Sequence, residues 1–165
     1  MATSAFLRLD GAPGESDQRA HEGWIEVDAW DWEVEARTSW PRGGGGASVG
    51  RPSPSALTVT HAFDLAAPFE FGRISSGTAF ARAELHVSRA VADGAVTYLT
   101  VQMEHVYLTR VAVTGTVDGG VLQQVSLVFK TIRFDYQPLD RRTGVLGPAV
   151  TYAWDIPAGV ASPAG

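Results

Sequence analysis

The sequence contains no cysteine, which excludes disulfide bonds, thiol nucleophiles and thiolate metal sites. It has only one lysine, Lys130, among thirteen basic residues, and its formal net charge is −5. A nucleic-acid partner needs concentrated Lys and Arg, so we expect none. No apolar run approaches the roughly 20 residues of a membrane helix, so we expect no membrane insertion.

The N-terminus also lacks a basic segment followed by an apolar one, so we expect no signal peptide. Export of such a chain would require a dedicated machine. What is present is 165 residues, 45% hydrophobic and 19% charged, a composition typical of a folded globular chain. We therefore expect a single domain over residues 1–165.

Alternation with a period of two residues dominates the hydrophobic pattern. Over residues 81–87 the odd positions are apolar and the even ones polar, and residues 150–156 alternate equally well. This is the pattern of half-buried strands. The dipeptides Asp93-Gly94 and Asp118-Gly119 separate β-rich runs and favour tight hairpins. The sequence therefore predicts a mainly β fold.

Two of the predicted strands change phase partway. Apolar residues occupy odd positions over 25–29 and even positions over 30–36; likewise Val125, Leu127 and Phe129 give way to Ile132. A shift of one residue in the buried face is what a β-bulge or a barrel corner produces. Two long strands that each turn a corner favour a closed or strongly coiled barrel over a flat sheet.

Three segments stand apart from the strands. Residues 64–74 predict one short helix, with an early proline at Pro68 and the sequence Ser75-Ser76-Gly77 at its end. Residues 41–55 are rich in glycine and proline and predict an extended, exposed loop without a strand interior. Residues 157–165 predict a C-terminal tail.

The four histidines show no metal-binding spacing, and we expect no metal and no cofactor. One functional reading pairs His21 with Glu22 or Glu26 as an acid/base site. The alternative, which we prefer, makes each histidine a surface or rim residue.

Catalytic patterns receive little support. Glu33 and Glu35 share one face of a strand, as a two-carboxylate glycosidase requires, but alternation already explains them as the solvated face. Gly45 and Gly50 have phosphate-loop spacing, yet Arg51-Pro52 replaces the necessary Lys and hydroxyl. No serine lies in a GxSxG elbow. We expect no enzymatic activity.

Aromatic content points instead to self-association. Five Trp, seven Phe and four Tyr exceed what one small core needs, and interfaces favour aromatics and Arg over Lys and Glu.

Read in order, several segments together resemble the haemolysin-coregulated protein (Hcp) family. They are residues 6–11, 14–16, 21, 25–27, 30–32, 43–46, 75–77, 135–138 and 152–156. No single segment is diagnostic, but their order and spacing span nearly the whole chain.

The resemblance implies a β-barrel of two antiparallel sheets flanked by one short helix. It implies a structural subunit of the type VI secretion tube, with six copies in a ring and rings stacked inside a contractile sheath. Its implied partners are further copies of itself, a spike protein of the valine-glycine repeat family, and secreted effectors carried in the lumen. The protein would be made in the bacterial cytoplasm and secreted through the type VI system without a signal peptide.

The resemblance also assigns residues. It implies a ring-stacking loop, whose candidate residues are Trp40, Arg42, Gly43, Gly44, Gly45 and Gly46. It places the helix at the subunit interface or lumen, which makes Phe69, Phe71 and Arg73 candidates, together with the aromatic Trp32. Pro52 and Pro54 depart from the family's polar, strand-like stretch and put the stacking geometry in question.

Three other hypotheses stay open on the sequence. One is a stand-alone barrel that binds carbohydrate or effectors, which predicts a monomer or dimer. Another is the tube subunit of a related phage-tail-like injection device, which shares the architecture. The third is an enzyme that uses the face of Glu33 and Glu35.

Overall fold

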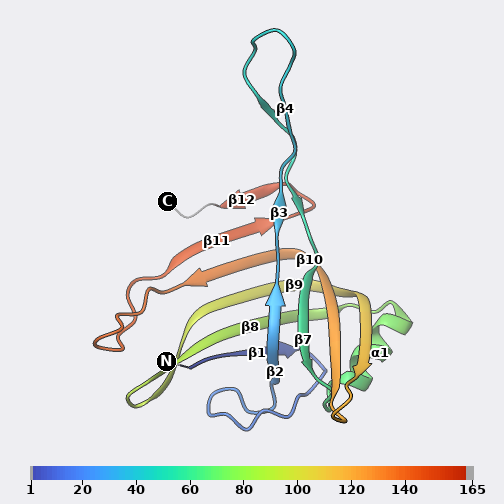
Figure 1. Cartoon of the computed structure of the whole chain (residues 1–165), viewed down its shortest axis with the longest axis vertical. Coiled ribbons are helices and arrows are strands. Elements are labelled where there is room, and N and C mark those ends of the chain that lie inside the picture. The colour runs from blue at the N-terminus through green and yellow to red at the C-terminus, as the bar shows by residue number, and fades with distance from the viewer. Residues whose placement is uncertain (1, 163–165) are drawn as a thin grey trace.

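The computed structural model describes residues 2–162 as an antiparallel β-barrel with one helix and a long projecting arm (Figure 1). Its elements are β1 Thr3–Leu9, β2 Ile25–Asp31, β3 Val34–Glu35, β4 Thr38–Ser39, β5 Ser48–Val49, β6 Ser53–Pro54, β7 Leu57–Ala62, α1 Ala67–Ser76, β8 Phe80–Val91, β9 Gly94–Gly115, β10 Val121–Tyr136, β11 Val150–Asp155 and β12 Val160–Ser162. The prediction of a mainly β barrel with one short flanking helix is confirmed.

The barrel closes because β10 pairs with both β7 and β9. The strand order is β12-β11-β10-β7-β2-β1-β8-β9, and the additional pairing of β9 with β10 completes a ring of six strands. In Figure 1, β2 and β7 cross the front of the barrel, and β8 and β9 run behind them. Closure leaves these six strands without a long unpaired edge.

Alternation places the core as predicted. Ala83, Leu85 and Val87 are buried on β8, and Trp154 is buried on β11. Both predicted hairpins form: β8 joins β9 through Asp93, and β9 joins β10 through Gly119, whose φ of 88° lies in the left-handed region that glycine tolerates.

The predicted phase changes are both present. On β2 the pairing with β7 shifts register between Val27 and Ala29. On β10 the buried face changes between Phe129 and Ile132, and the neighbouring strand β9 changes face between Met103 and Val106. Between those two residues lies His105, with a φ of 49°, so both strands turn the barrel corner at the same level.

Two segments that the sequence predicts as irregular contain short strands. Residues 41–55 are predicted as an extended, exposed loop, and the structure adds β5 and β6 within this segment, where two-residue ladders join β3 to β6 and β4 to β5. The tail at 157–165 contains β12, which pairs with Ala153 to Asp155 of β11. Residues 163–165 lie outside the described part of the chain.

Candidate assembly surfaces

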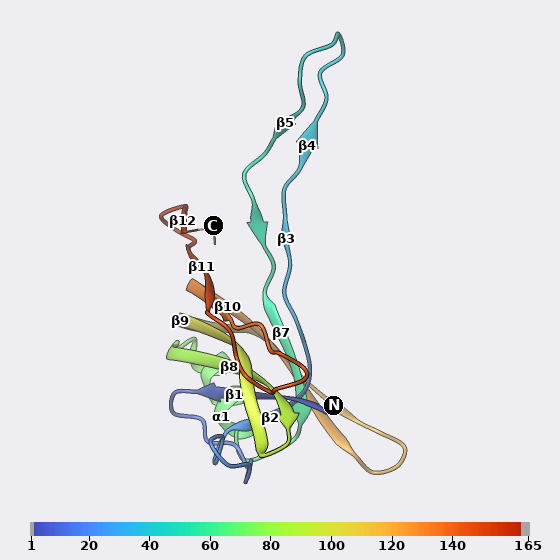
Figure 2. The ribbon, with the colours of Figure 1, turned by 90° about the vertical axis from the view of Figure 1, so that its left-hand side faces the viewer.

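The segment between β2 and β7 forms a β-ribbon that extends along the long axis of the molecule, away from the barrel (Figures 1 and 2). We call residues 33–55 the arm. Its base is fixed by Ser55, whose carbonyl oxygen accepts a hydrogen bond from Trp32 Nε1 and whose hydroxyl accepts one from the Glu33 amide, both at 3.0 Å. Farther out, the hydroxyls of Ser39 and Ser48 lie 2.6 Å apart.

The tip of the arm carries the predicted stacking residues. Trp40 keeps 75% of its surface exposed, and Arg42 and the four glycines are exposed as well. Gly43 and Gly44 have φ values of 125° and 88°, which only glycine adopts readily, so the glycine run permits the reversal of the chain. The arm contributes no residue to the buried core of the barrel.

Trp32 lies at the base of the arm and not at its tip. Its ring stacks on Phe134 at 5.4 Å between centroids, and it is half-buried against the core. Trp32 is therefore held by its own barrel, and the structure does not bring it together with Phe69, Phe71 or Arg73 on α1.

Helix α1 begins with Pro68 in its first turn and ends at Gly77, whose φ of 67° caps it in the left-handed conformation. Phe69 and Phe71 are exposed at 45% and 36%. Arg73 is only partly exposed, because its guanidinium lies 4.6 Å from the centre of the Phe80 ring and donates to the Ala79 carbonyl at 2.6 Å.

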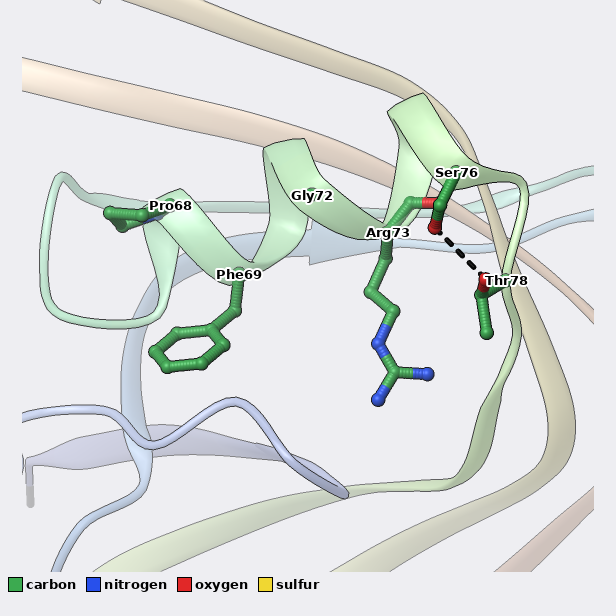
Figure 3. A pocket seen from close by; sticks show the side chains of 6 residues that line it. All are labelled: Pro68, Phe69, Gly72, Arg73, Ser76 and Thr78. Atoms are coloured by element: carbon green, nitrogen blue, oxygen red, sulfur yellow. Dashed lines mark hydrogen bonds between the residues drawn. The ribbon is translucent and has the colours of Figure 1, made fainter.

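A shallow hollow lies along this helix (Figure 3). It is lined by Pro68, Phe69, Gly72, Arg73, Ser76 and Thr78. The Phe69 ring and the Arg73 side chain extend to the same side of the helix, and Gly72 between them leaves the helix surface open. The arrangement offers a partner one aromatic ring and one cationic group beside a glycine.

A buried polar group fixes α1 to the barrel. His61 on β7, Glu70 on α1 and Gln123 on β10 have no solvent exposure. His61 Nδ1 donates to the Ala62 carbonyl at 2.7 Å, and Nε2 lies 3.1 Å from Glu70 Oε2, which also accepts from Gln123 Nε2. Burial lowers the pKa of His61, but the hydrogen bond and charge of Glu70 outweigh it and raise the pKa above its ordinary 6.5.

A second histidine cluster ties the β1–β2 loop to the barrel. His21 Nε2 lies 2.9 Å from His86 Nδ1, and His86 Nε2 lies 2.6 Å from Glu84. The His21 ring stacks on Phe6 at 4.3 Å between centroids. Burial, followed by the neighbouring His86, lowers the pKa of His21.

The expectation of surface or rim histidines was thus wrong for His21 and His61, which are 5% and 0% exposed. The proposed pairing of His21 with Glu22 or Glu26 does not occur, because its partner is His86. A sequence signal did exist for His61, since it continues the buried phase of Leu57 and Val59. Gln123 likewise precedes Val125 and Leu127 on the buried face of β10.

Part of the outward face of β1, β8, β9 and β10 is polar, and the same face also exposes Tyr107 on β9 and Leu122 on β10. In register across these strands, Arg8 pairs with Glu84, Glu84 with Gln102, and Gln102 with Arg133. Arg8 and Glu84 form a 2.8 Å ion pair. Glu33 and Glu35 are exposed near the base of the arm, far along the chain from either histidine cluster. Among residues 2–162, no group of His, Cys, Asp and Glu is arranged to hold a metal ion, and no helix is long and apolar enough to cross a membrane.

The fold and these surfaces define a closed antiparallel β-barrel with a projecting β-arm and an exposed aromatic helix. A family model described as "Type VI secretion system effector, Hcp" matches residues 6–136. Protein hcp1 of Pseudomonas aeruginosa is 30% identical over 159 residues, which cover 94% of this chain and 96% of that protein. The chain belongs to the Hcp family of the type VI secretion system.

Solved structures agree with this membership. The crystal structure of Hcp1 from Salmonella typhimurium covers 98% of this chain and 100% of its own, with 27% identity and a TM-score of 0.79. A structure described as that of a type six secretion system protein has the same coverage, 22% identity and a TM-score of 0.89, and it supports the fold alone.

Proposed function

We propose that this chain is a structural subunit of the type VI secretion tube, with six copies in a ring and rings stacked through the arm. The observation that carries the proposal is the arm itself. It belongs to an Hcp-family barrel, extends far from the core, and buries none of its tip residues within its own chain. An exposed tryptophan on a projecting ribbon is the kind of residue that concentrates binding energy at interfaces.

The helix supplies the second part of the proposal. Phe69, Phe71 and Arg73 would contact a neighbouring subunit within the ring or face its lumen. Exposed aromatics and Arg beside a shallow hollow are typical of the centre of an interface. The polar row of Arg8, Glu84, Gln102 and Arg133 on the outward face of these strands suits the wall of a water-filled channel, in which secreted effectors would travel.

The tube would be bounded by other components of the machine. A contractile sheath would surround it, and a spike protein of the valine-glycine repeat family would cap it. The subunit would be made in the bacterial cytoplasm and expelled with the tube, and it would have no enzymatic role.

Native mass spectrometry tests the ring. Six copies of the 17.6 kDa chain give about 106 kDa. A species of this mass, ring-shaped by electron microscopy, is the expected result. A monomer at high concentration would overturn the ring and favour a stand-alone binding barrel.

Deletion of Gly43 to Gly46 tests the arm separately. The ring mass is expected to stay unchanged, because these residues lie outside the barrel core. Stacked tubes are expected to disappear from electron micrographs. Tubes of unchanged length would overturn the stacking role of the arm.

A further inference from the structure

The contact between His21 and His86 fixes where protons lie in this histidine cluster. The Glu84 carboxylate, which also accepts from Arg8 at 2.8 Å, can only accept from His86 Nε2, at 2.6 Å. In the neutral ring the other nitrogen is then an acceptor, so His86 Nδ1 accepts the proton of His21 Nε2 across 2.9 Å. The hydrogen bond between the two rings therefore needs one of these facing nitrogens to be unprotonated.

The closed contact can hold one extra proton but not two. If His86 Nδ1 takes the first, His21 Nε2 becomes the acceptor and the proton of the His21 ring moves to Nδ1. With a second extra proton, both facing nitrogens carry hydrogens, and two positive rings would lie 2.9 Å apart. The doubly protonated pair therefore has to separate.

This contact holds one segment of the β1–β2 loop on the barrel. We call residues 17–22 the latch. Within the described chain, the bond from His21 to His86 is the one hydrogen bond that joins the latch to a barrel strand, since its other hydrogen bonds stay inside the loop. Ala20 has a φ of 73°, a left-handed conformation that is unfavourable for a residue with a Cβ. Opening of the latch would release this strain.

The latch covers a cleft on the outward face of β1, β8 and β9. The cleft has a volume of about 560 Å³, and the latch borders it with Gln18 and His21. Its opposite wall includes Ser4, Phe6 and Ser88. Phe6 alternates with the core residue Leu7 and so points outward, yet it is only 6% exposed, because the His21 ring stacks on it.

Few charges face the two rings. Glu84 on β8 is bonded to His86 and is shared with Arg8 on β1, so one carboxylate already paired with a cation serves the whole cluster. On β9, Thr100 and Gln102 lie in register with His86 and Glu84 and carry no charge. Other charged residues near the latch are exposed at the surface: Asp17, Arg19, Glu22, Glu26 and Asp93. The cluster therefore lacks the negative charge to neutralise two imidazolium rings.

We propose that the latch is an acid-operated closure, which lies over the cleft while His21 is neutral and opens when both His21 and His86 carry protons. Burial, followed by His86, lowers the pKa of His21 below 6.5, so the latch is closed at neutral pH and opens in acid. Opening uncovers the Phe6 ring and the hydroxyls of Ser4 and Ser88. A subunit folded at neutral pH and carried into acidic surroundings would then present a surface that it had kept covered.

Hydrogen exchange of the full chain, followed by mass spectrometry, tests the latch. The amides of His21, Gly23 and Trp24 donate to carbonyls within the loop, so closure protects them. After correction for the intrinsic pH dependence of exchange, protection of residues 16–24 is expected to fall at least tenfold from pH 7.5 to pH 5.0, because opening takes up protons. Residues 122–132 of β10 should stay protected. Equal protection of residues 16–24 at both pH values would overturn the proposal.

Two substitutions at one position separate charge from packing. His21→Gln can donate to His86 Nδ1 but cannot become charged, so residues 16–24 should stay protected at pH 5.0. His21→Lys carries its charge throughout and should lose protection at pH 7.5 as well. His105→Asn is the matched control, since it removes an exposed histidine outside the cluster and asparagine tolerates the φ of 49° there. It should respond to acid as the parent does.

Native mass at both pH values distinguishes the latch from a change in assembly. The expected result is loss of protection in the parent and in His105→Asn, with retention in His21→Gln, whatever the number of copies. If His21→Gln loses protection in acid as the parent does, the histidine pair is not the trigger and the proposal fails. Because the readout is local to residues 16–24, this outcome leaves the proposed tube function untouched.

Discussion

The imidazole of His61 and the carboxylate of Glu70 form a fully buried pair, with Nε2 and Oε2 3.1 Å apart, that joins strand β7 to helix α1. The Ala62 carbonyl can only accept a hydrogen bond, so His61 Nδ1 carries a proton and one further proton is shared with Glu70. The helix is therefore positioned by a buried polar contact, and removal of either partner would leave the other without its hydrogen bond.

Glu70→Ala should destabilise the protein by about 3–5 kcal/mol, because it leaves His61 buried without its partner. Urea denaturation at a fixed protein concentration measures the free energy of unfolding. The double variant His61→Leu, Glu70→Leu removes both polar groups and is expected to cost less than Glu70→Ala alone. A loss below about 1 kcal/mol in Glu70→Ala would mean that the pair does not anchor the helix.

The same pair predicts a pH dependence of stability. The pKa of His61 is raised above 6.5, so its contribution is complete below pH 6.5 and is lost as the pH rises through the raised pKa. Burial also raises the pKa of the neighbouring Asp64. Deprotonation of Asp64 therefore also lowers the stability of the fold as the pH rises above 3.8. Melting temperatures from pH 6.5 upward should fall in the parent chain.

His61→Gln is the comparison for this titration. It keeps a donor toward Glu70 and removes the titrating ring, so its melting temperature should start lower at pH 6.5 and change less as the pH rises. Parallel curves for the two proteins would show that the decline has another source.

Gly14 and Gly72 should respond oppositely to alanine. A Cβ at Gly14 would overlap the backbone of Trp24 and Ile25, so Gly14→Ala should cost about 1–3 kcal/mol through forced displacement of the β1–β2 loop. A Cβ at Gly72 meets nothing within 4 Å, and alanine there should stabilise the helix by up to about 1 kcal/mol. Thermal unfolding checks both, and a stabilising Gly14→Ala would contradict the packing described for the loop.

Phe71→Ala should weaken the ring without unfolding the barrel, because Phe71 is exposed on α1 and lies outside the core cluster. Native mass spectrometry over a dilution series is expected to show at least tenfold weaker assembly. Tyr107→Ala, an exposed aromatic on β9, is the control and should assemble as the parent does. Equal weakening of assembly in both variants would contradict a specific role of α1 in the ring interface.

Much of the barrel was predictable because strand alternation is a local signal. The phase change between Phe129 and Ile132 marked the corner, since a one-residue shift in the buried face needs no knowledge of the partner strand. The same logic placed His61 in phase with Val59 and could have identified it as buried. Its partner Glu70 was not predictable, because the buried face of α1 depends on how the helix docks.

The strand pairing within the arm, by contrast, could not be predicted from the local sequence. Its ladders are two residues long, and Pro54 and the glycine run carry no strand propensity. Their pairing follows from the β2–β7 register at the barrel, which brings the two ends of the segment together. The pairing of β12 with β11 likewise depends on an edge that the barrel offers and that no local pattern reveals.

Since the arm buries nothing in the core, the residues that decide folding are physically separate from those for which we propose a role in ring stacking. Substitutions between β4 and β5 are free to drift without endangering the monomer. Under the proposed stacking role, substitutions in the arm would change tube assembly and leave the stability of the barrel unchanged. It also makes the arm the natural insertion point for an engineered tag or affinity handle that reports on growth while the barrel folds undisturbed.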